Sequence, residues 1–227
     1  MLKVILWDVD GTLLDFKEAE KAAMRECFSV FGLGELSDER IAAYSEINHK
    51  YWRMLEEGQK TKPQILIERF EEFFAREGVS CDPEIFNQEY QVRLGDTVCF
   101  CDNSYELIQS LRGRVKQYAV TNGTFVAQRR KLEKSGLIRL FDDVFISDQI
   151  GAEKPSPAFF DHVFAAIGHY GPDEVVIVGD SLTSDMRGGN GADILCCWYN
   201  PDGAPIPGDL RIDYDIRDLN EIKNFLG

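Results

Sequence analysis

The stretch from residue 2 to residue 14 constrains the fold of this chain more than any other. Residues 4–6 read Val-Ile-Leu, an apolar run that is too short for a helix and is followed by a turn containing aspartate. Such a run is typical of a strand buried on both faces, at the centre of a parallel sheet. Asp8 and Asp10 come directly after it. Because ligands of open α/β sheets bind beyond the carboxyl ends of the strands, the stretch predicts an α/β fold with a carboxylate site at its central strand.

Strand-like and helix-like segments alternate from about residue 96 onward. The predicted strands are 115–121, 144–146, 174–178, 194–199 and 212–216, and the predicted helices are 104–112, 125–135, 157–167, a short one near 185, and 219–226. Alternation of this kind favours right-handed crossovers and a parallel sheet covered by helices on both faces. We therefore expect residues 1–14 and 96–227 to form one Rossmann-like domain.

Residues 15–95 show helical periodicity without any strand pattern. Four helices are predicted there, opened by capping residues or proline and mostly closed by glycine, as at Pro63 and Gly78. The segment is interpreted as a four-helix domain inserted after the first strand of the other domain.

Charge and composition exclude several classes of protein. The 227 residues carry 39 acidic and 25 basic side chains, a net charge of −14, which repels nucleic acid polymers and anionic membranes. No apolar run approaches the ~20 residues of a membrane span, and the start of the chain lacks the layout of a secretory signal. The six cysteines show no CxxC pair. We expect reduced thiols in a cytoplasmic protein, and a small-molecule substrate rather than a polymer.

Three further predicted strand ends carry residues suited to phosphate chemistry. Thr121, Asn122 and Gly123 stand between a strand and a helix start, where a phosphate binds well, although such residues are also ordinary helix caps. Lys154 follows the next strand, and its cation suits a phosphate oxygen, although an isolated lysine is usually solvated.

The last of these strand ends carries two more acids. Asp180 and Asp185 follow the apolar run at residues 175–178. Oxygen ligands on short side chains suit Mg²⁺, which takes one or two carboxylates and keeps several waters. Since the carboxyl ends of parallel strands share one edge of a sheet, these groups are expected to gather around Asp8 and Asp10.

The motifs D-x-D-G-T, T-N-G, K-P and G-D-x-x-x-x-D, in this order, resemble the four motifs of the haloacid dehalogenase superfamily of Mg²⁺-dependent phosphotransferases. The likeness covers essentially the whole chain. The helical insertion after the first motif resembles the type-one cap of that superfamily, so the resemblance implies a core of residues 1–14 and 96–227 and a cap of residues 15–95.

The resemblance also implies a role for each motif residue. Asp8 is the nucleophile and a Mg²⁺ ligand, and Asp10 is the general acid and base, with its backbone carbonyl on the metal. Asp180 is a further ligand, and Asp185 is either a ligand or an orienting group, a choice that the sequence leaves open. Lys154 pairs with the phosphate and the nucleophile. The phosphoryl group is held by Thr121 and the backbone amides of Asn122 and Gly123.

The implied reaction is hydrolysis of a phosphomonoester through an aspartyl-phosphate on Asp8. The segment Asn48-His49-Lys50-Tyr51-Trp52 resembles the cap of pyrimidine 5′-nucleotidases, so Asn48 and Trp52 are predicted to face a nucleoside monophosphate, while Phe70 and Phe73 are predicted to be core. The alternatives are a small-sugar or phosphoglycolate phosphatase, a phosphonatase, and a non-catalytic binding protein on this fold. The sequence leaves the physiological substrate and the oligomeric state open.

Overall fold

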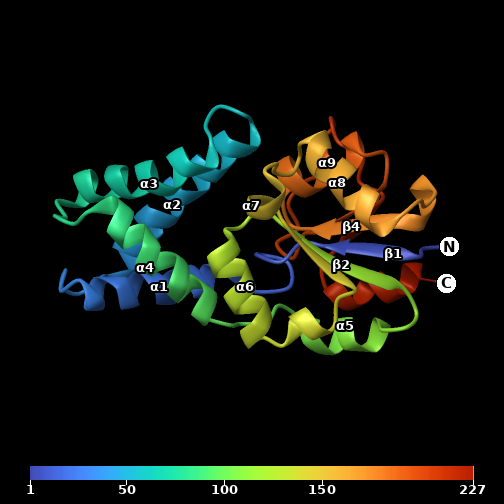
Figure 1. The fold of residues 1–227 in the computed structure, drawn as a ribbon, viewed down its shortest axis with the longest axis horizontal. Coiled ribbons are helices and arrows are strands. Elements are labelled where there is room, and N and C mark those ends of the chain that lie inside the picture. The colour runs from blue at the N-terminus through green and yellow to red at the C-terminus, as the bar shows by residue number, and fades with distance from the viewer. Residues whose placement is uncertain (227) are drawn as a thin grey trace. The chain divides into compact units, whose positions relative to one another are not determined.

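A computed structural model describes residues 1–226, and the chain divides into two compact units (Figure 1). One unit, called the core unit here, consists of residues 1–16 and the chain from residue 98 onward. The other, called the helical unit, consists of residues 17–97. The predicted divisions, after residues 14 and 95, lie close to the observed ones after residues 16 and 97.

The core unit is built on a six-stranded parallel sheet. Its strands are β1 (Val4–Trp7), β2 (Lys116–Thr121), β3 (Asp143–Ile146), β4 (Val175–Gly179), β5 (Leu195–Tyr199) and β6 (Tyr214–Ile216). Their order across the sheet is β3-β2-β1-β4-β5-β6. The central position of β1, between β2 and β4, agrees with the prediction from its apolar run.

Helices cover both faces of this sheet (Figure 1). They are α5 (Ser104–Leu111), α6 (Phe125–Lys134), α7 (Ser147–Ile150), α8 (Pro157–Ile167) and α9 (Arg187–Gly191), with 3₁₀ turns η1 (Leu137–Arg139), η2 (Pro172–Glu174) and η4 (Leu219–Phe225) and a π-helical turn η3 (Leu182–Met186). In Figure 1, α8 and α9 lie on one face of the sheet, and α5 lies on the other. The predicted parallel sheet with helices on both faces is confirmed.

Two apolar clusters lie on the two faces of the sheet. Ile5 and Trp7 belong to one cluster, and Val4 and Leu6 to the other, because successive side chains of a strand point to opposite faces. All four side chains have no exposed surface. This burial on both sides explains why β1 is apolar throughout, and it fixes the direction in which the chain leaves the sheet at Asp8.

The last helical segment differs in type from the prediction. The sequence predicts a closing helix over residues 219–226, and the structure has the 3₁₀ helix η4 instead. A 3₁₀ helix has three residues per turn, so Leu219, Ile222 and Phe225 lie in one row, and all three pack into the same apolar cluster.

The helical unit contains the four predicted helices, α1 (Phe16–Val30), α2 (Asp38–Glu56), α3 (Lys62–Glu77) and α4 (Pro83–Asp96). Their interior is aromatic: the rings of Tyr44 and Phe70 stack with centroids 5.2 Å apart, and Phe73 meets Tyr44 edge-on at 5.4 Å. Phe70 and Phe73 have no exposed surface, which confirms that they are core residues.

Disulfides and long apolar helices are both missing from residues 1–226. The six cysteines all have free thiols, and Cys196 and Cys197 on β5 are fully buried. Across the same residues, no helix combines the length and the apolar character that crossing a membrane requires.

Candidate active site

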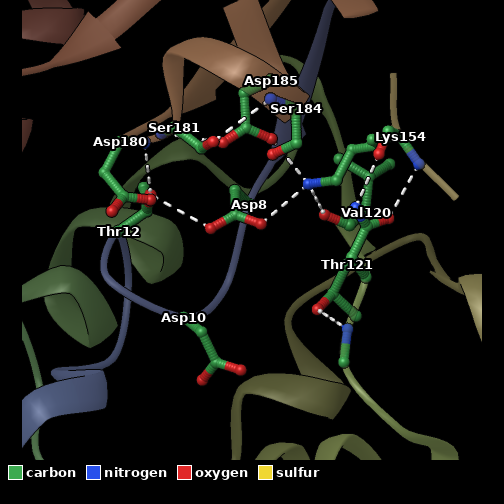
Figure 2. Close-up of polar contacts among 12 residues, drawn as sticks. Asp8, Asp10, Thr12, Val120, Thr121, Lys154, Asp180, Ser181, Ser184 and Asp185 are labelled. Carbon is green, nitrogen blue, oxygen red and sulfur yellow. Dashed lines mark hydrogen bonds and ion pairs between the residues drawn. The ribbon is translucent and has the colours of Figure 1, made fainter. Parts of the chain in front are cut away.

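The sheet order brings the motif residues to one edge. Because β1 lies between β2 and β4, the ends of these three strands place Asp8, Thr121 and Asp180 next to one another. Lys154 reaches the same place from the loop that follows β3 and α7 (Figure 2). The structure thus assembles in the core unit residues that lie far apart in the sequence.

Three carboxylates form the centre of this site. Asp8, Asp180 and Asp185 each offer one oxygen, and these oxygens lie within 4.8 Å of one another. Asp8 and Asp185 are buried, whereas Asp180 is exposed. Gly11 makes the close approach possible: its φ is +86°, and a Cβ there would lie 2.5 Å from an Asp180 oxygen.

Lys154 joins two of these acids from a fully buried position. Its Nζ donates to Asp8 Oδ1 at 2.8 Å, to Asp185 Oδ1 at 2.6 Å and to the carbonyl of Val120 at 2.8 Å. An ammonium has three donors, so each has an acceptor. Burial opposes the charged form, but the carboxylates of Asp185 and Asp8 outweigh it and raise the pKa of Lys154. The lysine therefore stays cationic beside the predicted nucleophile.

Thr12 is a site residue to which the sequence analysis gives no role. Its hydroxyl accepts the N–H of Asp180 at 3.0 Å and lies 3.2 Å from Asp8 Oδ2 and 3.4 Å from Asp180 Oδ1. One hydroxyl has one hydrogen, so it donates to only one of the two carboxylates at a time. In the sequence this residue is the threonine of D-x-D-G-T, but the motif alone does not show that its hydroxyl contacts Asp8 and Asp180.

The T-N-G loop after β2 is locked to the loop of Lys154. The Asn122 side chain donates to the Lys154 carbonyl at 2.7 Å and accepts the Lys154 N–H at 2.8 Å. The Thr121 hydroxyl accepts the N–H of Gly123 at 3.2 Å and keeps its own hydrogen to donate. The side-chain cap of α6 is Thr124, so Asn122 positions the lysine loop instead of capping the helix.

Asp10 is held apart from the other acids. In Figure 2 its carboxylate points away from Asp8 and Lys154. Gln128 Nε2 donates to Asp10 Oδ2 at 2.6 Å, and the Lys131 ammonium pairs with Oδ1. Gln128 and Lys131 are not among the predicted site residues. The sequence feature that connects them is their spacing of three residues on one helix, which puts both on the same face.

The donor set fits a hard divalent cation. Three carboxylates face the single positive charge of Lys154, so the site has an excess of negative charge. Carboxylate oxygens are the ligands that Mg²⁺ prefers, and a divalent ion offsets that excess. The predicted metal ligands Asp8, Asp180 and Asp185 are therefore brought together, while the backbone carbonyl of Asp10 stays a prediction.

The protonation of Asp8 gives this site a testable pH dependence. Burial raises the pKa of the Asp8 carboxyl to about 7 against the opposing effect of Lys154, and Asp185 adds to the rise. A raised pKa means that the folded protein binds this proton more tightly than the unfolded chain. The resulting stability is present below the ordinary pKa of 3.8 and is lost as the pH rises through about 7.

We therefore expect the melting temperature of the metal-free protein to fall between about pH 5 and about pH 8. Mg²⁺ should raise it more at the higher pH, where the ligand carboxylates are already ionised. Thermal unfolding with a chelator or with Mg²⁺ measures both effects, and Asp8→Asn should flatten the pH dependence while the exposed-loop variant Asp202→Asn keeps it. Equal stabilisation by Mg²⁺ at both pH values would contradict this expectation.

The prediction for Asn48 in the helical unit is contradicted by its contacts. Asn48 is 2% exposed, its Nδ2 donates to Glu20 at 2.7 Å, and its Oδ1 accepts from the buried Arg69 guanidinium at 2.7 Å. A buried amide must satisfy its polar atoms inside the protein, and this one connects three helices of its own unit. Asn48 therefore stabilises the helical unit instead of facing a nucleoside. Trp52 is partly exposed, and its contact with substrate stays a prediction.

Comparison with known proteins agrees with this geometry. A family model described as haloacid dehalogenase-like hydrolase matches residues 2–193. The HAD-hydrolase YfnB of Bacillus subtilis is 35% identical over 224 residues, which are 99% of this chain and 95% of that protein. The crystal structure of YfnB bound to magnesium has a TM-score of 0.92 at 34% identity and covers 100% of this chain and 99% of that one.

Two further relatives carry more specific names. Pyrimidine 5′-nucleotidase PynA of Streptococcus pneumoniae is 34% identical, over 99% of this chain and 94% of that protein. Pyrimidine 5′-nucleotidase YjjG of Escherichia coli is 27% identical, over 98% of this chain and 96% of that protein. The chain belongs to the haloacid dehalogenase-like hydrolases and is an enzyme of that family, which confirms the resemblance found in its motifs.

Proposed function

We propose that this enzyme is a Mg²⁺-dependent phosphatase that acts through a phosphoryl group on Asp8, and that its substrates are pyrimidine nucleoside monophosphates. The observation that carries the reaction is the Asp8 carboxylate, buried at the end of β1 against the ammonium of Lys154 and beside Asp180. The names of PynA and YjjG support the substrate class.

Asp8, Asp180 and the backbone carbonyl of Asp10 are the groups assigned to hold Mg²⁺. When bound, the ion supplies positive charge that offsets the phosphate dianion. Asp185 is assigned to positioning, because its Oδ1 accepts from Lys154 at 2.6 Å and its Oδ2 from the N–H of Ser181 at 3.2 Å. Through these bonds Asp185 holds the ammonium of Lys154 in place beside the nucleophile Asp8.

The first half-reaction transfers the phosphoryl group to Asp8. A carboxylate oxygen of Asp8 attacks phosphorus, the bond from phosphorus to the ester oxygen breaks, and protonated Asp10 gives its proton to the leaving alkoxide. The Thr121 hydroxyl, which keeps its own hydrogen, donates to a phosphoryl oxygen. All three Nζ hydrogens of Lys154 have acceptors in the free site, so the lysine exchanges one of these acceptors for a phosphoryl oxygen, and its charge offsets the charge that develops there.

The second half-reaction restores the enzyme. Asp10, now ionised, takes a proton from a water molecule, and the oxygen of that water attacks phosphorus. The bond from phosphorus to Asp8 then breaks, which releases inorganic phosphate and returns Asp8 to its carboxylate form. Asp10 is again protonated and ready for the next substrate.

A substrate panel tests this function. The purified enzyme is assayed for phosphate release from UMP, dUMP, dTMP, AMP, phosphoglycolate and small-sugar phosphates, with Mg²⁺ and with a chelator. We expect kcat/KM for the pyrimidine nucleotides to exceed that for the sugar phosphates by at least about tenfold, and the chelator to remove the activity.

Each other result of the panel has a defined meaning. Hydrolysis confined to sugar phosphates or phosphoglycolate keeps the phosphatase reaction and rejects the nucleotide substrate. Hydrolysis that does not depend on a divalent metal rejects the assignment of the carboxylates. The lack of any hydrolysis, including that of 4-nitrophenyl phosphate, rejects the phosphatase reaction as a whole.

A further inference from the structure

We infer that Gln128 and Lys131, on the face of α6 turned toward Asp10, are positioning residues that set the orientation of the Asp10 carboxylate. This inference rests on the proposed function, in which Asp10 first gives and then takes a proton. The two residues are called the α6 clamp here.

The α6 clamp holds both oxygens of one carboxylate. Gln128 Nε2 donates to Oδ2 at 2.6 Å, and the ammonium of Lys131 pairs with Oδ1. A carboxylate held at one oxygen still swings about its bond to Cβ, whereas donors at both oxygens fix its plane. The helix supplies the two donors from positions three residues apart, which lie on one face about one turn from each other.

The burial of the α6 clamp is unusual for its residue types. Lys131 and Gln128 are each 1% exposed, although lysine and glutamine usually reach solvent. The side chain of Asp10 keeps 21% of its surface exposed. Two buried side chains thus hold the partly exposed carboxylate at which the chemistry is proposed. A purely structural ion pair has no need to leave its acid accessible.

Gln128 also contacts the phosphate-binding loop. A Cβ at Gly123 would lie 2.0 Å from Gln128 Nε2, so only glycine lets the amide take this position. An ionised carboxylate only accepts hydrogen bonds, which turns Nε2 toward Asp10 and Oε1 away from it. Gln128 Oε1 is buried and has no hydrogen-bond partner in the described part of the chain.

The α6 clamp therefore positions Asp10 in both half-reactions of the proposed mechanism, as the proton donor in the first and as the proton acceptor in the second.

Leaving-group dependence separates this role from a structural one. UMP has an alkoxide leaving group that needs the proton of Asp10, whereas 2,4-dinitrophenyl phosphate has a leaving group that departs without it. The ratio kcat/KM reports the steps up to the phosphoryl enzyme. Misplacing Asp10 should therefore lower kcat/KM for UMP much more than for the dinitrophenyl ester.

The test compares Lys131→Met and Gln128→Leu with Asp10→Asn as the reference. We expect each clamp variant to lose about 10- to 100-fold in kcat/KM for UMP and less than about threefold for the dinitrophenyl ester. Lys131→Arg keeps a cationic donor and should recover most of the activity. Arg129→Met is the matched control: it removes one positive charge from the same helix at an exposed side chain that pairs with Glu133, and its activity should equal that of the wild type.

The possible failures are distinguishable. Equal losses on both substrates in a folded Lys131→Met protein, or activity within about twofold of the wild type, overturn the inference while the proposed function stands. Wild-type enzyme that hydrolyses neither substrate overturns the proposed function instead. The melting temperatures of all variants show which of them are folded. If Lys131→Met does not fold, the same comparison of the two substrates is made with Gln128→Leu.

Discussion

Asp8→Asn is expected to abolish turnover, with kcat lowered by at least about 10⁴-fold, because loss of a nucleophile is among the largest single effects in enzymes. Asparagine has nearly the shape of aspartate, but its amide forms no stable ester with a phosphoryl group. It also lacks the charge that Lys154 contacts at 2.8 Å. The measurement is steady-state phosphate release together with acid quenching of the phosphoryl enzyme, which should accumulate only where Asp8 is present.

The Asp8→Asn protein should fold. Burial raises the pKa of the Asp8 carboxyl to about 7, so its negative charge destabilises the folded state at neutral pH. Replacing this charge with a neutral amide should therefore not lower the free energy of unfolding. Asp202→Asn, in an exposed loop, serves as the control for a change of one acid to its amide. A folded Asp8→Asn enzyme with a kcat within about tenfold of the wild type would rule out a phosphoryl group on Asp8.

The positions of the motif residues follow from local sequence and the rules of parallel sheets. An apolar run such as residues 4–6 can be buried only between neighbouring strands, and its polar successor must then stand at the edge of the sheet. The same reasoning applies to β2 and β4, which end at Thr121 and close to Asp180. The order of the strands thus brings together residues that lie far apart in the sequence. The residues at the predicted strand ends are sufficient to predict this grouping.

The partners of these residues could not be predicted in the same way. Lys131 and Gln128 lie on a helix whose charged residues Arg129, Glu133 and Lys134 are exposed, and a lysine on such a helix is usually solvated. Only the packing of α6 against the loop after β1 turns them toward Asp10. Asn48 shows the converse: its place on a predicted cap helix suggested a substrate contact, but Glu20 and Arg69 bury it in a polar network that periodicity does not reveal.

Lys154→Met should lower both activity and stability, because it leaves two buried carboxylates without their cation. Methionine keeps the length and the apolar stem of lysine but removes all three Nζ contacts. Breaking a buried ion pair by removing one partner typically costs about 3–5 kcal/mol. We expect a decrease of this size in the free energy of unfolding of the metal-free protein, measured by urea titration, and turnover lowered by at least about 10²-fold through the loss of charge at the phosphoryl group.

A second substitution shows whether charge is the cause. In Lys154→Met/Asp185→Asn one of the two orphaned carboxylates becomes neutral, so part of the lost stability should return, whereas activity should not. The stability deficit of Lys154→Met should also be larger at about pH 8 than at about pH 6, since at the lower pH the buried acids can take up protons. A deficit that neither the second substitution nor the pH changes would mean that Lys154 acts by packing alone, and its assignment as the cation that holds the nucleophile would fail.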